Sequence, residues 1–491
     1  MTPIKVLFVA GELTPLAKVG GLGDVIGALP KSLVKKGVDA RIVIPKYGIV
    51  EEKKYGLKKI AADISVPFAG QEEKISIYES LLPGSQVPVY YIDNLKYLGG
   101  GGVYFEKDAS SGGSSRECQR FTFFARAIPE IFEKLEFWPD IVHCHDWHVG
   151  LVPFLLKEMG KKDGRFGKIK TLLTIHNFAY QGKYNYDEAT GYLNLKKDGD
   201  LEEILTHFDA QTINYLQQAI AYADLINTVS PTYAREILTP SYGEGLNKFL
   251  AKRKKDLSGI VNGIDAEIFN PETDPNLACN YSLNDLQGKS DDKIDLQKIT
   301  GLTINEKIPI FGLVGRLADQ KGVDLLAPLL SDLTKKGCQF IILGAGLTKF
   351  EEIVRKMASD YPDNVFAKIA FDAALAQKIY AGADFFLMPS RFEPCGLGQM
   401  IAMRYGTIPI VRATGGLSDT VEEFTPETGQ GTGFRFNNFK ADEFLASVEK
   451  SLEIFQNKES WRKIKENAMR QDFSWERSGG QYLKLYQKLK I

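Results

Sequence analysis

The sequence predicts an α/β protein with two Rossmann-like domains, each built on a parallel sheet and both facing a common cleft. Short, nearly continuous apolar runs rich in β-branched residues recur along the whole chain, as expected of strands buried on both faces. Amphipathic stretches of helix length separate many of these runs. Two runs, at 5–12 and 308–316, lead into glycine-bearing turns, which is typical of the first strand of a separate sheet.

Nine of the apolar runs are predicted strands, at 6–10, 40–45, 140–144, 171–175, 224–230, 308–315, 339–344, 384–390 and 407–413. Predicted helices include 23–36, 322–336, 349–359 and 440–455. This alternation indicates right-handed crossovers between parallel strands. We expect the domain boundary near 259–266, where turn glycines precede a polar segment. The N-terminal domain then spans 1–258 and the C-terminal domain 259–474.

Composition excludes several classes of protein. The chain has 491 residues, with 61 Lys plus Arg against 62 Asp plus Glu, so bulk charge does not favour nucleic acid or anionic membrane as a partner. No apolar run approaches the roughly 18 residues of a membrane span, and the N-terminus is too short for a signal peptide. Five scattered cysteines contain no CxxC pair, which fits a reducing compartment. We therefore expect a cytoplasmic protein; its oligomeric state stays open.

One segment, at 98–115, is biased toward glycine and serine. This composition makes a single ordered conformation unexpected, and both a mobile lid and a long surface loop fit it.

Two glycine-bearing turns carry candidate ligand cations. In AKVGGLGD at 17–24, Gly20 and Gly21 let the backbone approach a ligand, and Lys18 adds a point charge. An ordinary tight turn with an exposed lysine is the alternative. In GRLADQKG at 315–322, Arg316 and Lys321 stand five residues apart at the end of a strand and could bind a diphosphate.

The segment HCHDWH at 143–148 contains four His or Cys residues, which is typical of a zinc site. However, side chains alternate along a strand, so Cys144 points to the opposite face from His143 and His145, and no second cluster completes a tetrahedral site. We therefore predict no metal. Asp146, Trp147 and His148 suit sugar hydroxyls and a sugar face, whereas a capped turn with core histidines is the alternative. His176 and Asn177 end another strand and are expected at the same rim.

A further loop, SRFEPCGLGQ at 390–399, follows a predicted strand and precedes a helix. Glu393 is either a helix cap or a substrate contact there. Cys395 has no partner pattern for a nucleophile, so we expect it to pack or to make a local contact. Walker A, G-x-S-x-G and HExxH patterns are missing. If these cationic side chains bind the anion and no metal is required, the pattern is typical of a transferase whose leaving group is a nucleotide diphosphate.

The sequence resembles the bacterial glycogen synthases and plant starch synthases, which are retaining glucosyltransferases of GT-B fold. The resemblance runs nearly end to end. The segments that carry it are KVGGLGDVIGALP at 18–30, HCHDWHVGL at 143–151, TIHNFAYQG at 174–182, INTVSPTYAREI at 226–237, GIVNGID at 259–265, GRLADQKGVDLL at 315–326, MPSRFEPCGLGQ at 388–399, VRATGGLSDTV at 411–421 and FSW at 473–475.

This resemblance implies transfer of glucose from ADP-glucose to the non-reducing 4-OH of an α-1,4-glucan, with retention and without a cofactor. It implies catalytic roles for Glu393, His176, Lys321 and Arg316. It implies substrate-binding roles for Lys18, Gly20, Gly21, Asp24, Asp146, Trp147, His148, Asn177, Asn262, Phe371, Cys395, Gly396 and Leu397. It also implies that 475–491 crosses back onto the N-terminal domain. We further expect the two domains to close, because Lys18 and Arg316 belong to opposite halves and must meet one ligand.

Two positions depart from the family pattern. Gly398 stands where many bacterial relatives have threonine, so a hydroxyl that could touch phosphate is lost. Phe371 stands where relatives often have tyrosine, so it can stack on a base but cannot donate a phenolic hydrogen bond.

The expected mechanism uses one carboxylate. A retaining hydrolase would need a second one about 5 Å from the first, and Ile401 stands eight residues after Glu393. We therefore expect the acceptor to attack from the leaving-group face, with a diphosphate oxygen taking its proton.

Three alternatives remain open. A glucan phosphorylase would need lysine-bound pyridoxal phosphate. A non-catalytic glucan-binding protein would not need the cations and Glu393 together. A transferase that uses UDP-glucose to make sucrose or a trehalose precursor fits the motifs poorly.

Overall fold

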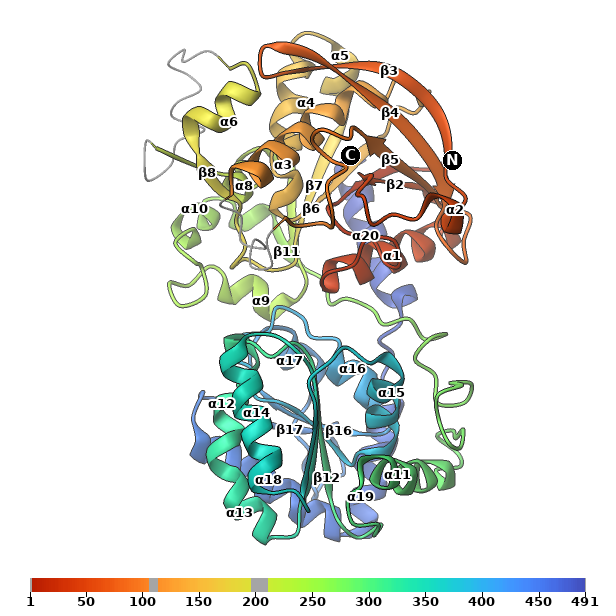
Figure 1. Cartoon of the computed structure of the whole chain (residues 1–491), viewed down its shortest axis with the longest axis vertical. Helices are drawn as coiled ribbons and strands as arrows, with labels where there is room; N and C mark the ends of the chain where they lie inside the picture. Colours follow the sequence, from red (N-terminus) through yellow and green to blue (C-terminus); the bar gives the residue numbers. More distant parts are fainter. Residues whose placement is uncertain (1, 106–113, 196–210, 491) are drawn as a thin grey trace. The chain divides into compact units, whose positions relative to one another are not determined.

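The computed structural model describes residues 2–105, 114–195 and 211–490 (Figure 1). The chain forms two compact units. The first comprises Met1–Val229, Ala234–Gly263 and Trp475–Ile491, and the second comprises Ser230–Tyr233 and Ile264–Ser474. No helix in the described ranges has the length and apolar character needed to cross a membrane.

The first unit is built on a nine-stranded sheet in the order β11-β10-β7-β6-β1-β2-β5-β4-β3. Its parallel strands are β1 (Lys5–Val9), β2 (Asp39–Pro45), β5 (Pro88–Asp93), β6 (Ile141–His145), β7 (Lys170–Ile175), β10 (Leu225–Thr228) and β11 (Leu257–Gly259). β3 (Lys58–Phe68) and β4 (Gln71–Leu81) extend one edge in antiparallel fashion. Every residue of β6 is buried, as expected of a strand covered on both faces.

Among the described residues, the longer helices of the first unit are α1 (Gly21–Lys35), α3 (Ser115–Ala127), α4 (Val152–Gly160), α8 (Tyr215–Tyr222) and α20 (Trp475–Lys490). Shorter helices are α2 (Glu52–Tyr55), α5 (Gly164–Gly167), α6 (Tyr186–Tyr192) and α10 (Asn247–Ala251), and β8 (Lys183–Asn185) pairs with β9 (Thr212–Asn214). The division between the units falls inside α9 (Pro231–Glu236), after Tyr233.

The final helix, α20, is anchored to the sheet of the first unit. Ser32 on α1 donates to the carbonyl of Trp475 at 2.8 Å. Tyr486 is fully buried and its hydroxyl lies 2.8 Å from Nδ1 of His143 on β6. The end of the chain therefore supports the strand that carries candidate site residues.

The second unit contains a six-stranded parallel sheet in the order β14-β13-β12-β15-β16-β17. These strands are β12 (Ile310–Val314), β13 (Gln339–Leu343), β14 (Val365–Lys368), β15 (Phe385–Met388), β16 (Ile408–Arg412) and β17 (Phe434–Phe436). Its helices are α11 (Gln287–Thr300), α12 (Val323–Leu326), α13 (Leu330–Lys335), α14 (Thr348–Asp360), α15 (Ala373–Gly382), α16 (Gly398–Arg404), α17 (Gly415–Thr420), α18 (Ala441–Gln456) and α19 (Lys458–Met469). Figure 1 shows α12, α13 and α14 on one side of this sheet and α11, α15 and α16 on the other.

All nine predicted strands are present, and the predicted parallel α/β class is confirmed. The single helix predicted at 322–336 is wrong. A 3₁₀ turn at Ala327–Leu329 divides it into α12 and α13, because Pro328 has no backbone N–H for an α-helical bond.

The glycine-rich segment at 98–115 is only partly described, since 106–113 lie outside the described residues. The expectation of no single conformation for the whole segment stays a prediction. The buried guanidinium of Arg120 donates to the carbonyls of Gly100, Gly102 and Val103, and it lies 3.6 Å from the centroid of the Phe105 ring. These bonds hold the start of the segment in place.

Candidate functional site

In the first unit, the loops after β6 and β7 meet through Asp146. This residue follows β6 and has φ +60°, a left-handed conformation that costs a non-glycine residue about 1–3 kcal/mol. Its Oδ1 accepts from the backbone N–H of His176 at 2.6 Å, and its own N–H donates to the Thr174 carbonyl at 3.0 Å. The strained backbone therefore places His176 beside the end of β6, as the sequence predicts for one rim.

A chain of histidines runs inward from this rim. Nε2 of His176 lies 3.0 Å from Nδ1 of His145, and the rings of His145 and His143 are 4.0 Å apart. His143 in turn contacts Tyr486 and Thr174. Burial lowers the pKa of His176 to about 3 and holds the pKa of His143 and His145 well below the usual value. The histidines are therefore neutral, and the pair at the rim shares one hydrogen bond that orients His176.

Trp147 does not present a ring face to a ligand. It is fully buried, stacks on His148 at 4.1 Å and meets Phe121 edge-on at 5.0 Å. At Gly182, where φ is +62°, a Cβ would lie 2.4 Å from the Trp147 ring. The expected direct contact between Trp147 and a sugar is therefore absent from this arrangement; the indole instead supports His148 from behind.

His148 and Asp146 are buried polar groups next to this support. Nε2 of His148 lies 2.6 Å from the Tyr104 hydroxyl, while its Nδ1 has no hydrogen-bond partner among the described residues. Burial lowers the pKa of His148 to about 3 and raises the pKa of Asp146 to about 8. Both side chains are thus uncharged near neutral pH, so they are better suited to bind the hydroxyl groups of a ligand than to bind ions.

The glycine-bearing turn before α1 is organised by Glu12, which the sequence analysis did not identify. Its buried Oε2 accepts from the N–H groups of Val19 at 2.9 Å and Gly20 at 2.7 Å, and burial raises its pKa. The Gly20 amide is therefore occupied, whereas Gly21 starts α1. Lys18 forms a partly exposed ion pair with Asp24 at 2.7 Å, so two predicted substrate contacts bind each other.

Two asparagines at the rim differ in their partners. Oδ1 of Asn177 accepts from the N–H of Ala179 at 3.1 Å, so it closes a local turn. Asn262 is buried, and its Oδ1 finds no hydrogen bond within the described part of the chain. An unsatisfied buried acceptor is costly, so Asn262 can accept a donor from a ligand.

In the second unit, the predicted catalytic residues Lys321 and Glu393 are in direct contact. Lys321 ends a one-turn 3₁₀ helix after β12, and its Nζ lies 2.5 Å from Oε2 of Glu393. Ser390 donates to the same oxygen at 3.1 Å, and Gln320 donates to the Phe392 carbonyl at 3.0 Å. Glu393 is only 6% exposed, so its carboxylate is held in place at the end of β15 by a cation and a hydroxyl.

The loop that carries Glu393 is clamped by groups far away in the sequence. The buried guanidinium of Arg412, on β16, donates to the carbonyls of Ser390 and Arg391. At Gly322 a Cβ would lie 2.0 Å from the carbonyl oxygen of Pro389, and at Gly415 it would lie 2.0 Å from that of Glu393. Both glycines have positive φ, so only glycine fits at either side of the loop.

The other predicted residues of the second unit differ in exposure. Arg316 is exposed two residues after β12 and forms no ion pair with a described residue, so its charge is available to an anion. Phe371 is 87% exposed, which leaves its ring open for stacking. Cys395 is buried, Gly396 has φ +75°, and Leu397 precedes α16. None of the five cysteines forms a disulfide.

The departure at Gly398 has a packing explanation. A Cβ at this position would lie 2.8 Å from the ring of Phe386, on β15. The phenyl ring therefore takes the space that a larger residue would need. In the described ranges, no three His, Cys, Asp or Glu side chains form a group that could hold a metal ion.

Comparison with known proteins agrees with this layout. Residues 5–252 match the family described as starch synthase catalytic domain, and residues 297–471 match the group 1 glycosyl transferases. A glycogen synthase of Thermotoga maritima is 45% identical over 491 residues, covering 99% of each chain. One of Streptococcus uberis is 43% identical over 496 residues, covering 99% of this chain and 100% of that one.

Solved structures give the same result. The catalytic domain of starch synthase IV from Arabidopsis thaliana, bound to ADP and acarbose, superposes with a TM-score of 0.90 at 34% identity, and 99% of each chain is covered. A sucrose-phosphate synthase from Thermosynechococcus elongatus, at 17% identity and a TM-score of 0.62 over 99% of each chain, shares the fold alone. The predicted GT-B fold class and the predicted glycosyltransferase activity are thereby confirmed. The chain belongs to the family of bacterial glycogen synthases and plant starch synthases.

Proposed function

We propose that this enzyme transfers glucose from ADP-glucose to the non-reducing 4-OH of an α-1,4-glucan and retains the configuration at the anomeric carbon. The observation that carries the proposal is the contact of Lys321 with Glu393 after β15, together with the exposed Arg316 after the neighbouring strand β12. Family membership and the ADP and acarbose named with the starch synthase IV structure support the choice of substrates.

In the proposed reaction, Arg316 and Lys321 bind the diphosphate. Departure of ADP places negative charge on its oxygens, and fixed cations stabilise that charge by about 2.7–4 kcal/mol for each well-placed donor. Phe371 offers its exposed ring to the base. The loop Cys395-Gly396-Leu397 and the start of α16 lie next to Glu393 in the chain and supply backbone N–H groups.

Glu393 acts on the glucosyl group in this proposal. Its paired carboxylate contacts the transferred sugar, which becomes oxocarbenium-like as ADP leaves. No second carboxylate follows at the position of Ile401, so we propose front-side attack in which a diphosphate oxygen takes the acceptor proton and no covalent adduct forms. Trapping a glucosyl group on Glu393 would contradict that step.

The first unit supplies groups for the sugars. His176 is neutral and oriented by His145 and by Asp146, so it is suited to a polar but uncharged contact beside the anomeric centre. His148, Asn177 and Asn262 offer hydrogen bonds. Lys18, Asp24, Gly20 and Gly21 belong to the turn before α1; their proposed role is to border the sugar nucleotide, with the turn itself held by Glu12.

The experiment is to incubate the full chain with maltoheptaose and ADP-glucose and to follow both products. We expect one ADP for each α-1,4-linked glucose added, and proton NMR should show the new anomeric proton in the α configuration. UDP-glucose is the matched donor. Parallel incubations with fructose or glucose 6-phosphate in place of maltoheptaose test for the sucrose or trehalose phosphate that the alternative transferase would give. A β linkage, or UDP-glucose as the preferred donor, would contradict the proposal.

A further inference from the structure

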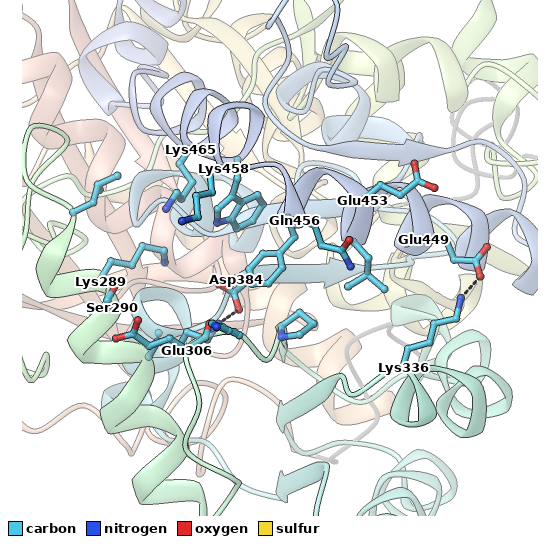
Figure 2. Close-up of a pocket in the computed structure, with 18 residues that line it drawn as sticks. Lys289, Ser290, Glu306, Lys336, Asp384, Glu449, Glu453, Gln456, Lys458 and Lys465 are labelled. Atoms are coloured by element: carbon cyan, nitrogen blue, oxygen red, sulfur yellow. Dashed lines mark hydrogen bonds and ion pairs between the residues drawn. The ribbon is translucent and has the colours of Figure 1, made fainter.

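The second unit contains a cavity of 1260 Å³ that the proposed reaction does not use. Pro309 and Asp384, which line it, come directly before β12 and β15, whereas Arg316 and Glu393 follow these strands. The cavity therefore lies at the opposite, amino-terminal end of the parallel sheet. Helices α11, α18 and α19 supply most of its wall, as Figure 2 shows.

The lining carries excess positive charge. Six lysines face four carboxylates, which leaves a formal charge of +2. Lys336 pairs with Glu449 at one end of the cavity (Figure 2). Lys293 pairs with Asp384 at 2.7 Å. Asp384 is buried and also accepts from the N–H of Ile310, so it neutralises one ammonium and is committed to the sheet.

Two more lysines, Lys289 and Lys465, interact electrostatically with Asp384, but neither forms an ion pair with a described residue. Lys289 is buried, and its Nζ donates to the carbonyls of Ala381 and Ala383 and to the Thr407 hydroxyl, which are all neutral acceptors. Lys465 is half-buried and forms no hydrogen bond or ion pair in the described part of the chain. Burial lowers the pKa of Lys289 to about 7 and also lowers that of Lys465. A second anion in the cavity would stabilise the protonated, charged form of both lysines.

An aromatic wall stands next to Lys465. Its Nζ lies 5.6 Å from the centroid of the Trp461 ring, and Trp461 meets Phe455 edge-on with centroids 5.1 Å apart. Neither ring is fully buried. The cavity thus combines a place for a dianion with a flat apolar surface, which is the usual composition of a small-molecule site.

We propose that this cavity is a binding site for a small phosphate monoester, distinct from the site of glucosyl transfer. The phosphoryl oxygens accept from Lys465 and from the remaining proton of Lys293, and exposed Lys458 at the start of α19 completes the cationic side. The organic part of the ester lies against Trp461. A dianion balances the formal charge of +2 that the lining has when all six lysines are protonated, and it favours that protonated state; lysine binds phosphate as a point charge.

The test is isothermal titration calorimetry on the full chain with inorganic phosphate, glucose 1-phosphate and phenyl phosphate. Wild type is compared with Lys465→Gln, with the charge-conserving Lys465→Arg, and with Lys463→Gln, which removes an exposed lysine from the same helix. We expect Lys465→Gln to weaken the binding of all three probes at least tenfold, whereas Lys465→Arg and Lys463→Gln stay within twofold of wild type. Binding at the proposed diphosphate site is common to all variants and cancels in the comparison.

Two results would overturn the proposal: no probe binds wild type with a Kd of about 10 mM or lower, or Lys465→Gln binds the probes as tightly as wild type does. The aromatic part has a separate variant. We expect Trp461→Leu to abolish the preference for phenyl phosphate over inorganic phosphate, and equal affinities of wild type for all three probes would contradict the role given to Trp461. Circular dichroism melts show whether each variant is folded.

Discussion

The neutral histidines of the first unit predict a specific dependence of stability on pH. His148 is 3% exposed and burial lowers its pKa to about 3, against about 6.5 in an unfolded chain. As pH falls below 6.5, His148 binds a proton in the unfolded state but stays neutral in the folded state. The stabilisation present above pH 6.5 is therefore lost progressively down to about pH 3, at about 1.36 kcal/mol for each pH unit.

The perturbation that isolates this effect is His148→Gln, because other groups titrate as well. Asp146 acts in the opposite direction: its pKa is raised to about 8, so its contribution to stability is lost as pH rises from about 4 to 8. Asp146 is present in both proteins and cancels. Between pH 7.5 and 5.0, wild type should lose about 2 kcal/mol more of its free energy of unfolding than the variant does.

The assay is native-state hydrogen exchange of the β6 amides in wild type and in His148→Gln, at both pH values after correction for intrinsic exchange rates. These amides report opening of the first unit, so unfolding of the second unit does not confuse the result. Equal losses in the two proteins would refute the claim that His148 is buried and neutral.

Three further outcomes are expected. Lys321→Met removes the ammonium 2.5 Å from Glu393 and should lower kcat by about 10²–10³-fold with a smaller change in KM, measured by ADP release; an unchanged kcat would speak against the pairing. Gly415→Ala places a Cβ against the carbonyl of Glu393 and should lower both Tm and kcat. The control Gly480→Ala, where a Cβ meets nothing within 4 Å, should leave kcat unchanged. Equal activity of the two variants would contradict the claim that Gly415 fixes the loop of Glu393. Tyr486→Phe removes the hydroxyl bonded to the first histidine of β6 and should cost about 1–3 kcal/mol in urea unfolding; no loss would mean that α20 does not support this strand.

Nine of the parallel strands could be predicted from the sequence because each forms a nearly continuous apolar run, as expected of strands buried on both faces. The parallel strands β5, β11, β14 and β17 were not among these nine. The edge hairpin could not be predicted in this way. In β4 only Ile75, Ile77 and Ser80 are buried, and exposed charged residues stand at its start. A strand with one solvated face shows alternation rather than a continuous run, so a search for continuous runs passes over β3 and β4.

Site residues could be predicted where a reactive or charged side chain stands in a loop directly after a predicted strand. Lys321 and Glu393 stand in loops after buried strands, and the structure brings them into contact. Arg412 and Glu12 were not predictable as supports of these loops. Arg412 lies 21 and 22 positions from the carbonyls it binds, and a buried carboxylate that binds backbone N–H groups looks in a sequence like any acidic residue after a strand.

The role of Trp147 could not be predicted from its residue type alone. A tryptophan beside histidines at a strand end suits a sugar face, but Phe121 and Gly182 come from other segments and cover its ring. Packing between distant segments decides whether an aromatic side chain is a binding surface or part of the core.

The central claim is that these loops transfer glucose from ADP-glucose to a glucan, and radiolabel incorporation tests it most directly. Glycogen is incubated with the full chain and with glucose-labelled ADP-glucose or UDP-glucose, and the precipitated polymer is counted and then digested from its non-reducing ends. We predict that label from ADP-glucose enters the polymer, that it is released first on digestion, and that UDP-glucose labels at least tenfold more slowly. Label recovered only as glucose in solution, or no label in the polymer from ADP-glucose, would contradict the claim.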